Sequence, residues 1–229
     1  MNLIIKVGQF IAIGLLITGC NKNLMEENPI ANLYPEIKIG QIKEYKIIEL
    51  TQTAGKEIQD QYFIKEVVTD TVRFNQELYF VKTIYKSGVE NGLWVFLETE
   101  FEYKNLKGVF LKKDNSHVQK VGFPVGFSTT WKINQRIESL ENNTAKYLDF
   151  KTAYTVGNEN WADGYVVQVE KDSTGIHNFQ EKEYYSPKYG LISSLKRTIF
   201  YCQDNANCLG KNIEESNKTI TKTLQKITR

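Results

Sequence analysis

Three carboxylates alternate along one short stretch of the chain, at Glu98, Glu100 and Glu102. Carboxylates bind divalent cations where several meet at one point, and two that flank a substrate act as general acid and base. The alternation predicts a β-strand, in which same-face neighbours lie about 6.6 Å apart, too far for three carboxylates to share one ion directly. We therefore expect a solvated strand face, paired across strands with Lys112 or Lys113.

The other residue types that carry chemistry are scattered. His117 and His177 each lie beside a turn, far apart in sequence and without an acidic residue at metal-binding spacing. Gly126-Phe127-Ser128 lacks the second glycine of a nucleophile elbow, and the chain contains no phosphate loop or dinucleotide fingerprint. We therefore predict a protein that is not an enzyme, with no cofactor and no metal site.

A cysteine ends the hydrophobic stretch at the start of the chain. Lys6 leads into an apolar run from Val7 to Ile17. Its roughly eleven residues, at about 1.5 Å each, reach only about 16 Å, short of a hydrocarbon core of about 30 Å. The run therefore indicates a signal peptide rather than a membrane span or a buried helix. It ends in Ile17-Thr18-Gly19-Cys20, which resembles the lipobox of bacterial lipoproteins and implies that Cys20 is acylated, with palmitate for example, and becomes the new N-terminus.

The remaining two cysteines, Cys202 and Cys208, form an even pair in a chain that we expect to be exported. Export places them in an oxidising compartment, which favours a disulfide. Free thiols and a metal site are the alternatives, and a metal site needs four ligands near one point.

The resulting organisation is a signal peptide over 1–19, a flexible tether over 20–34 and a single β domain over 35–229. The formal net charge is only +2, with no basic block, so we expect no nucleic-acid partner. The lipid anchor makes a membrane the first partner. Asn21 is not the aspartate that often retains lipoproteins at inner membranes, so we predict the outer membrane, on its periplasmic or its surface side.

The elements that position these residues are short alternating runs divided by turn residues, a pattern typical of an all-β protein. Thirteen Tyr and twelve Phe fit strands better than a helical bundle. The last segment, 218–229, is ambiguous, because its apolar spacing fits a helix while its threonines favour a strand; we predict a strand. The other expected strands are 42–51, 61–70, 77–86, 93–103, 108–113, 117–121, 127–137, 145–156, 164–171, 178–186 and 190–201.

Two internal echoes suggest that the sheet consists of two similar meanders. Gly40 precedes Tyr45-Lys46-Ile47 by five residues, and Gly126 precedes Trp131-Lys132-Ile133 in the same way. A looser echo pairs the strand at Tyr62 with the strand at Tyr165, and chance similarity is the alternative for both. We expect Tyr45 and Trp131 to be buried in one curved sheet, each after a glycine that turns the chain.

Several strands are apolar on both faces and so need cover on both. The aromatic residues that we consider for a ligand-binding face are Trp94, Phe96, Tyr79 and Trp131. In a curled sheet, such residues can face an apolar ligand on the concave side or fill the core themselves.

Three landmarks resemble a bacterial exported family grouped with TapB-like proteins and related to the lipoprotein carrier LolA. They are Pro35-x4-Gly40-x4-Tyr45, Phe123-Pro124-Val125-Gly126-x4-Trp131 and the segment from Glu183 to Ile192. The chain departs from the family at Ile42, where a Trp is usual. The resemblance implies an antiparallel sheet curled into an open half-barrel, and it implies no activity.

The sequence thus predicts a lipid-anchored envelope protein that acts by binding. The ligand is a lipid, a glycan or a protein, with an apolar ligand such as an acyl chain in the curved sheet as one form. The alternative is an envelope-assembly or adhesion component that binds another protein through a sheet edge or an exposed apolar patch.

Overall fold

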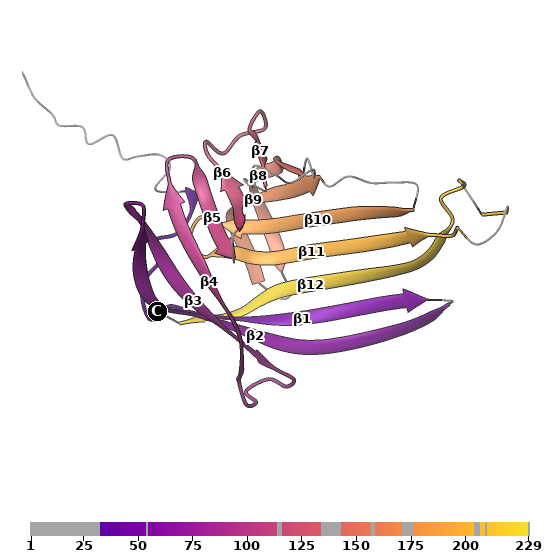
Figure 1. The fold of residues 1–229 in the computed structure, drawn as a ribbon, viewed down its shortest axis with the longest axis horizontal. Coiled ribbons are helices and arrows are strands. Elements are labelled where there is room, and N and C mark those ends of the chain that lie inside the picture. The colour runs from indigo at the N-terminus through magenta and orange to yellow at the C-terminus, as the bar shows by residue number, and fades with distance from the viewer. Residues whose placement is uncertain are drawn as a thin grey trace, which may run out of the picture.

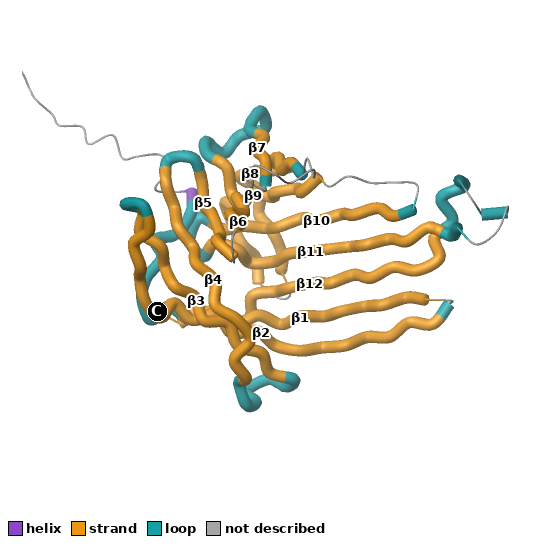
Figure 2. Tube along the Cα trace, viewed as in Figure 1, coloured by secondary structure: helices purple, strands orange, loops and turns teal. Residues whose placement is uncertain are grey.

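The computed structural model describes residues 33–53, 55–113, 116–133, 143–156, 159–170, 176–203, 207–208 and 210–228. All twelve strands belong to one antiparallel sheet, drawn in Figures 1 and 2. Their bounds are β1 Ile42–Thr53, β2 Lys56–Phe74, β3 Glu77–Ser87, β4 Val95–Asn105, β5 Gly108–Lys113, β6 Ser116–Gly122, β7 Thr130–Lys132, β8 Thr144–Val156, β9 Glu159–Glu170, β10 His177–Ser186, β11 Gly190–Tyr201 and β12 Glu214–Thr228. In this part of the chain no helix is long and apolar enough to cross a membrane.

The sheet is an up-and-down meander that curls into a nearly closed barrel. Its first and last strands pair with each other, because β1 and β12 form a ladder from Ile42 and Thr228 to Thr53 and Ser216. The two edge strands are therefore β6 and β7, from the middle of the chain. Figure 1 shows β1, β2 and β10 to β12 running on beyond the curled part as a long ribbon. The predicted all-β half-barrel is confirmed, with its opening between β6 and β7.

A few contacts bridge this seam without a continuous ladder. The Gln119 backbone N–H donates to the Ile133 carbonyl at 2.9 Å, and Trp131 Nε1 donates to the Gln119 carbonyl at 3.0 Å. The Trp131 ring packs on Gly122, where an added Cβ would lie 2.7 Å from Trp131 Cε3, so this position needs a glycine. The seam is thus held by the Trp131 side chain and a backbone hydrogen bond rather than by a continuous strand ladder.

The main core lies inside the curl. Its buried members include Trp131, Tyr147, Tyr165 and Tyr185, and the Tyr165 and Tyr185 rings stack at 5.4 Å. Tyr34, in the segment before β1, is also 5% exposed and belongs to this core, although the sequence places it in the tether. The predicted signal peptide and Cys20 lie outside the described residues, as does the tether up to residue 32.

Most strand predictions are confirmed to within a few residues, and 214–228 is a strand, as expected for the ambiguous last segment. Three differ in length. The strand expected over 164–171 begins five residues earlier, at Glu159. Of the strand expected over 127–137, the described residues form a strand only at Thr130–Lys132, because residues 127–129 belong to the turn that follows β6. Residues 134–137 lie outside the described residues. The strand expected over 61–70 extends to 56–74, because β1 and β3 pair with it on both sides.

The first internal echo is confirmed in part. Tyr45 and Trp131 are both buried, at 1% and 8% exposure, in strands of the same sheet. Gly40 has a φ of +85°, as a turning glycine should, whereas Gly126 has no positive φ, so the shared turn is wrong. The looser echo joins β2 to β9, which hold different places in the two six-stranded halves of the meander.

The predicted disulfide is present. Cys202 and Cys208 are bonded, with their Cα atoms 5.6 Å apart. The bond closes the start of the connection between β11 and β12, at the far end of the long ribbon in Figure 1.

Candidate functional site: a charged cavity inside the sheet

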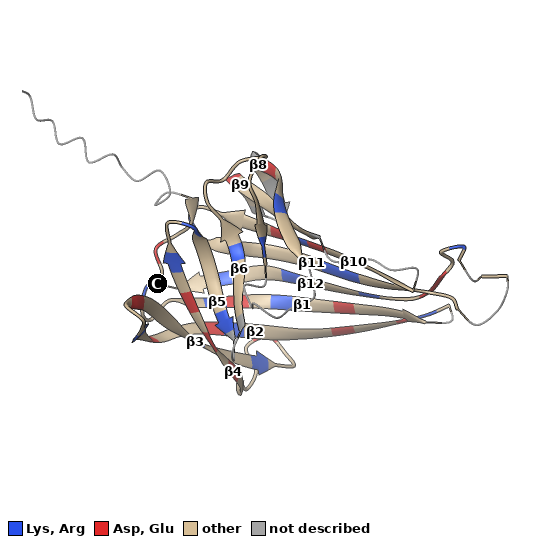
Figure 3. Cartoon of the chain, turned by 45° about the horizontal axis from the view of Figure 1, so that its top comes forward, with Lys and Arg blue, Asp and Glu red and all other residues tan. Residues whose placement is uncertain are grey.

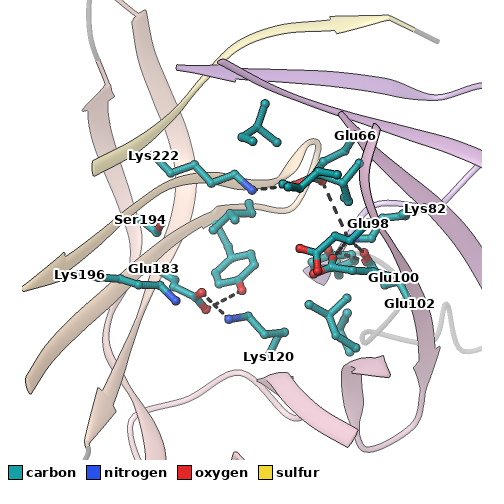
Figure 4. Close-up of a pocket in the computed structure, with 18 residues that line it drawn as sticks. Glu66, Lys82, Glu98, Glu100, Glu102, Lys120, Glu183, Ser194, Lys196 and Lys222 are labelled. Atoms are coloured by element: carbon teal, nitrogen blue, oxygen red, sulfur yellow. Dashed lines mark hydrogen bonds and ion pairs between the residues drawn. The ribbon is translucent and has the colours of Figure 1, made fainter. Parts of the chain in front are cut away.

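A cavity of about 280 Å³ opens within the curl, between β2 to β5 on one side and β10 to β12 on the other. Its apolar lining includes Ile64, Ile84, Val109, Leu111 and Leu191, and two tyrosines, Tyr34 and Tyr185, reach into it. Charged side chains complete the wall, as Figure 4 shows: Glu66, Lys82, Glu98, Glu100, Glu102, Lys120, Glu183, Lys196 and Lys222.

Strand pairing explains why these charges share one face. Lys82 of β3 pairs with Glu100 of β4, and residues directly opposite each other in a ladder point to the same side. Glu98 and Glu102 are two residues away from Glu100 in either direction and therefore face the same side. Alternation along each strand thus builds the wall. Figure 3 shows that basic and acidic residues are also interleaved along the long strands.

Lys82 is the centre of the charged network. Its Nζ lies 2.8 Å from Glu102, 3.5 Å from Glu100 and 3.9 Å from Glu66. Burial alone would lower the pKa of Lys82, but Glu102 and Glu66 outweigh it and raise that pKa. The ammonium therefore stays charged inside the barrel, where it holds strands β2, β3 and β4 together.

Glu66 links this centre to the far side of the barrel. Its Oε1 accepts a hydrogen bond from Lys222 Nζ at 2.6 Å, and Lys222 also lies 4.0 Å above the ring of Tyr45. Burial would raise the pKa of Glu66, but Lys222 and Lys82 lower it to about 2. Two cations from different strands therefore keep one buried carboxylate ionised.

A second group of charges lies on the β10 side. Lys120 Nζ donates to Glu183 at 2.5 Å, and the Tyr185 hydroxyl donates to the other oxygen of Glu183 at 2.8 Å. Burial lowers the pKa of Lys120, but Glu183 more than compensates and raises it. Lys196 pairs with Glu181 at 2.8 Å, and its side chain is 49% exposed. The Lys120–Glu183 pair also joins β6, next to the seam, to β10.

The segment before β1 closes part of the cavity. The Tyr34 hydroxyl donates to Glu102 Oε1 at 2.8 Å, and the Tyr34 carbonyl accepts from Lys104 Nζ at 2.9 Å. The Tyr165 hydroxyl donates to the Leu33 carbonyl at 2.9 Å. Burial and the nearby Glu102 raise the pKa of Tyr34 well above its ordinary value, so its hydroxyl remains a donor. The chain that leads toward the predicted anchor is thus tied directly to the cavity wall.

The expected solvated face at Glu98, Glu100 and Glu102 is wrong. Glu102 is 5% exposed and pairs with Lys82, while the expected partner Lys112 lies 4.3 Å above the Phe74 ring. Lys112 pairs in register with Phe101, so it lies on the opposite side of the sheet. The reason is closure of the barrel, which turns the carboxylate side of β4 inward.

The four aromatic residues predicted for a ligand face lie elsewhere. Tyr79 is buried on the outer side of the sheet, 4.5 Å from the Tyr103 ring, and Trp131 is in the core at the seam. Trp94 lies under Lys65, whose Nζ is 4.4 Å from its ring, and Phe96 is 59% exposed beside Tyr85. None of the four lines the cavity. Sequence reasoning also did not predict the ion pairs of Glu66 with Lys82 and Lys222.

The structure also shows where the two histidines lie. His117 lies on the outer side of the sheet, 6.1 Å from the Tyr103 ring, and His177 is 4.7 Å from Phe179. The structure brings the two histidines into no common site. Within the described residues, no group of three or more His, Cys, Asp or Glu side chains is arranged to hold a metal ion.

An exposed apolar patch borders the cavity. It comprises Val89, Leu93, Val95, Phe96 and Leu97, at the connection between β3 and β4, with exposures from 50% to 91%. Leu97 also lines the cavity. In Figure 2 this connection projects below the body of the sheet.

Comparison with known proteins finds distant structural neighbours. No protein-family model and no curated protein matches the chain. A solved structure described as an exported protein with a YmcC-like fold, from Bacteroides fragilis, matches 86% of this chain and 99% of its own at 10% identity and a TM-score of 0.38. A DUF1329 family protein from Desulfovibrio piger matches 80% of this chain and 84% of its own at 10% identity and a TM-score of 0.21.

A third neighbour is described as an outer membrane lipoprotein-sorting protein domain from Vibrio parahaemolyticus. It matches 82% of this chain and 84% of its own at 8% identity and a TM-score of 0.19. Similarity at this distance specifies no ligand and no activity.

Proposed function

We propose that this chain is a lipid-anchored envelope protein that binds a ligand inside its curved sheet. The observation that supports this function is the charged cavity. A core that served stability alone would be close-packed and apolar, because protein interiors leave few voids larger than a water molecule. Here an open volume of about 280 Å³ is kept beside ionised groups, which cost several kcal/mol each to desolvate.

The lining suits a ligand with both apolar and polar parts. The aliphatic residues around Val109 and Leu111 offer contact to an apolar group such as part of an acyl chain, while the ion pairs offer hydrogen bonds. The volume is slightly below the usual range of about 300–1,000 Å³ for small-molecule sites, which favours a compact group over a whole lipid. Acylation at Cys20 would hold the cavity close to a membrane, and the outer membrane is our proposed location.

Mass spectrometry of the lipoprotein purified from membranes tests this function. We expect the wild-type protein to carry a bound small molecule. Leu111→Trp, which fills the cavity, should abolish that mass, whereas the control Leu106→Trp, on a turn where the residue is 70% exposed, should retain it. Circular dichroism verifies that both variants fold. A wild-type protein without a bound mass, or a Leu111→Trp variant that still carries it, would contradict the proposal.

The exposed patch favours a second candidate function, binding of another envelope protein. Leu93 is 91% exposed and is followed by four further apolar residues, an arrangement that marks interaction surfaces. A photo-crosslinking amino acid at Leu93 should then give one discrete protein adduct in intact cells, and the same group at Leu106 should give none. Equal labelling at both positions, or adducts with lipid alone, would count against this function.

A further inference from the structure

The cavity offers hydrogen-bond acceptors and donors from opposite walls. Figure 4 shows Glu98, Glu100 and Glu102 together on the β4 side, and Lys196 and Lys222 on the β11 and β12 side. Both groups border one continuous volume. Carboxylates outnumber ammonium groups on the side of β2 to β4, where only Lys82 faces Glu66, Glu98, Glu100 and Glu102. The reverse holds on the opposite side, where Lys120, Lys196 and Lys222 line the cavity with Glu183. A ligand that occupies this volume therefore meets an excess of carboxylates at one end and an excess of ammonium groups at the other.

The carboxylate wall retains capacity to accept hydrogen bonds. Glu100 and Glu102 share one lysine of the neighbouring strand, Lys82, which also lies near Glu66. Lys82 approaches Glu100 only to 3.5 Å, longer than the usual range for an N–H···O hydrogen bond. A carboxylate has about four lone-pair sites, so a ligand N–H group can bind here without breaking the pair between Lys82 and Glu102.

The ammonium wall retains capacity to donate. Lys196 has its salt bridge to Glu181 at 2.8 Å, and half of its side chain is exposed. An ammonium carries three N–H groups, which leaves donors for an anionic oxygen of a ligand. Lys222 has the same surplus beside its bond to Glu66.

From this arrangement, and on the basis of the proposed function, we propose that the ligand is zwitterionic. Its cationic amine binds at Glu100 and its phosphate or carboxylate binds at Lys196. An anion without an amine would face the carboxylates of β4, and a simple amine would leave Lys196 without a new acceptor. An uncharged ligand would desolvate ions on both walls without compensating their charge. The amine and the anion must be separate groups of one molecule, since the two walls lie across the cavity.

Titration calorimetry of the full lipoprotein in detergent, with four matched fragments, tests the charge pattern. The fragments are glycerophosphoethanolamine, glycerol 3-phosphate, ethanolamine and glucose. We expect glycerophosphoethanolamine to bind at least tenfold more tightly than the other three. Dihexanoyl phosphatidylethanolamine then distinguishes the sources, because a further tenfold gain indicates a lipid headgroup and equal affinity indicates a free zwitterion.

Two variants test the assigned contacts. Glu100→Gln should weaken glycerophosphoethanolamine and ethanolamine at least tenfold without affecting glycerol 3-phosphate. Lys196→Met should weaken glycerophosphoethanolamine and glycerol 3-phosphate and leave ethanolamine unchanged. The controls Glu90→Gln and Lys226→Met remove charges from exposed side chains that do not line the cavity and should change neither.

The proposal is overturned if a singly charged fragment or glucose binds as tightly as the zwitterion, or if Glu100→Gln and Lys196→Met behave as the controls do. If no fragment binds, the molecule carried by the purified protein decides. A zwitterion supports the proposal, and any other charge pattern refutes it while the proposed function stands. A protein that carries nothing and binds nothing refutes both.

Discussion

Removing the central ammonium should destabilise the protein in a way that depends on pH. Lys82→Met preserves length and apolar volume but leaves Glu66, Glu100 and Glu102 without their shared cation. Breaking a buried ion pair by removing one partner costs about 3–5 kcal/mol, because the remaining charge stays buried. Lys222 still compensates Glu66, so most of the loss should come from Glu102, which is 5% exposed. The expected loss is about 3–5 kcal/mol near pH 7, a large part of an ordinary domain's stability.

The sign of the pH dependence should reverse in this variant. In the wild-type protein, the pKa of Glu66 is about 2, against 4.5 when unfolded, so its stabilisation is present above pH 4.5 and is lost as the pH falls toward 2. This shift is worth about 3 kcal/mol. Lys43 and the Tyr34 hydroxyl still favour the charged form of Glu102 in this variant, but without Lys82 we expect burial to outweigh them and to raise the pKa of Glu102 above 4.5. A group with a raised pKa stabilises below its unfolded value, and that stabilisation is lost as the pH rises through the folded value.

Urea denaturation followed by tryptophan fluorescence, at several pH values between 4 and 8, measures both effects. The double variant Lys82→Met/Glu102→Gln should recover much of the loss at pH 7, because it removes the stranded charge. Lys38→Met, which breaks the exposed pair with Glu36, is the matched control and should cost less than about 1 kcal/mol. A Lys82→Met variant as stable as wild type at pH 7, or one whose stability does not increase on acidification, would refute the reasoning.

Three further predictions concern the seam, the disulfide and the anchor. Trp131→Ala should lower stability by about 3–5 kcal/mol in a thermal melt, because it removes the buried ring that packs between β6 and β7. The control Phe127→Ala, at a position that is 62% exposed, should change stability little. An unchanged melting temperature together with weakened ligand binding would instead make Trp131 a ligand-binding residue. Replacing Cys202 and Cys208 by serine should cost about 2 kcal/mol or less in urea denaturation, since they close a small loop, and a larger loss would contradict the loop argument. Cys20→Ala should abolish labelling by a palmitate analogue, and unchanged labelling would disprove the anchor.

The sequence is sufficient to predict strand positions because alternation and turn residues are local signals. It predicts two faces for β4, one with Glu98, Glu100 and Glu102 and one with Phe101 and Tyr103. It does not predict which face is concave, because that depends on the pairing of β1 with β12 at the two ends of the chain. Because apolar side chains are usually buried, the sequence favours the aromatic face of β4 as the interior.

The structure reverses this expectation because both faces of these strands are covered. On the outer side, Tyr79, Tyr103 and Phe110 bury one another. On the inner side, Lys82 makes burial of the carboxylates tolerable. The hydrogen bond from Tyr34 to Glu102 could not be predicted from local sequence patterns either, because the two residues lie far apart along the chain.

Closure of the sheet by its first and last strands has a consequence for how the protein folds. Ten of the eleven strand ladders join neighbours in sequence, and these hairpins can form as the chain emerges. Among the ladders of the described residues, only the one between β1 and β12 must wait for the end of the chain, because it closes a loop of almost the whole domain. Until then β1 and the β11 hairpin present unpaired edges that other chains can join, so a chaperone would have most effect during this period.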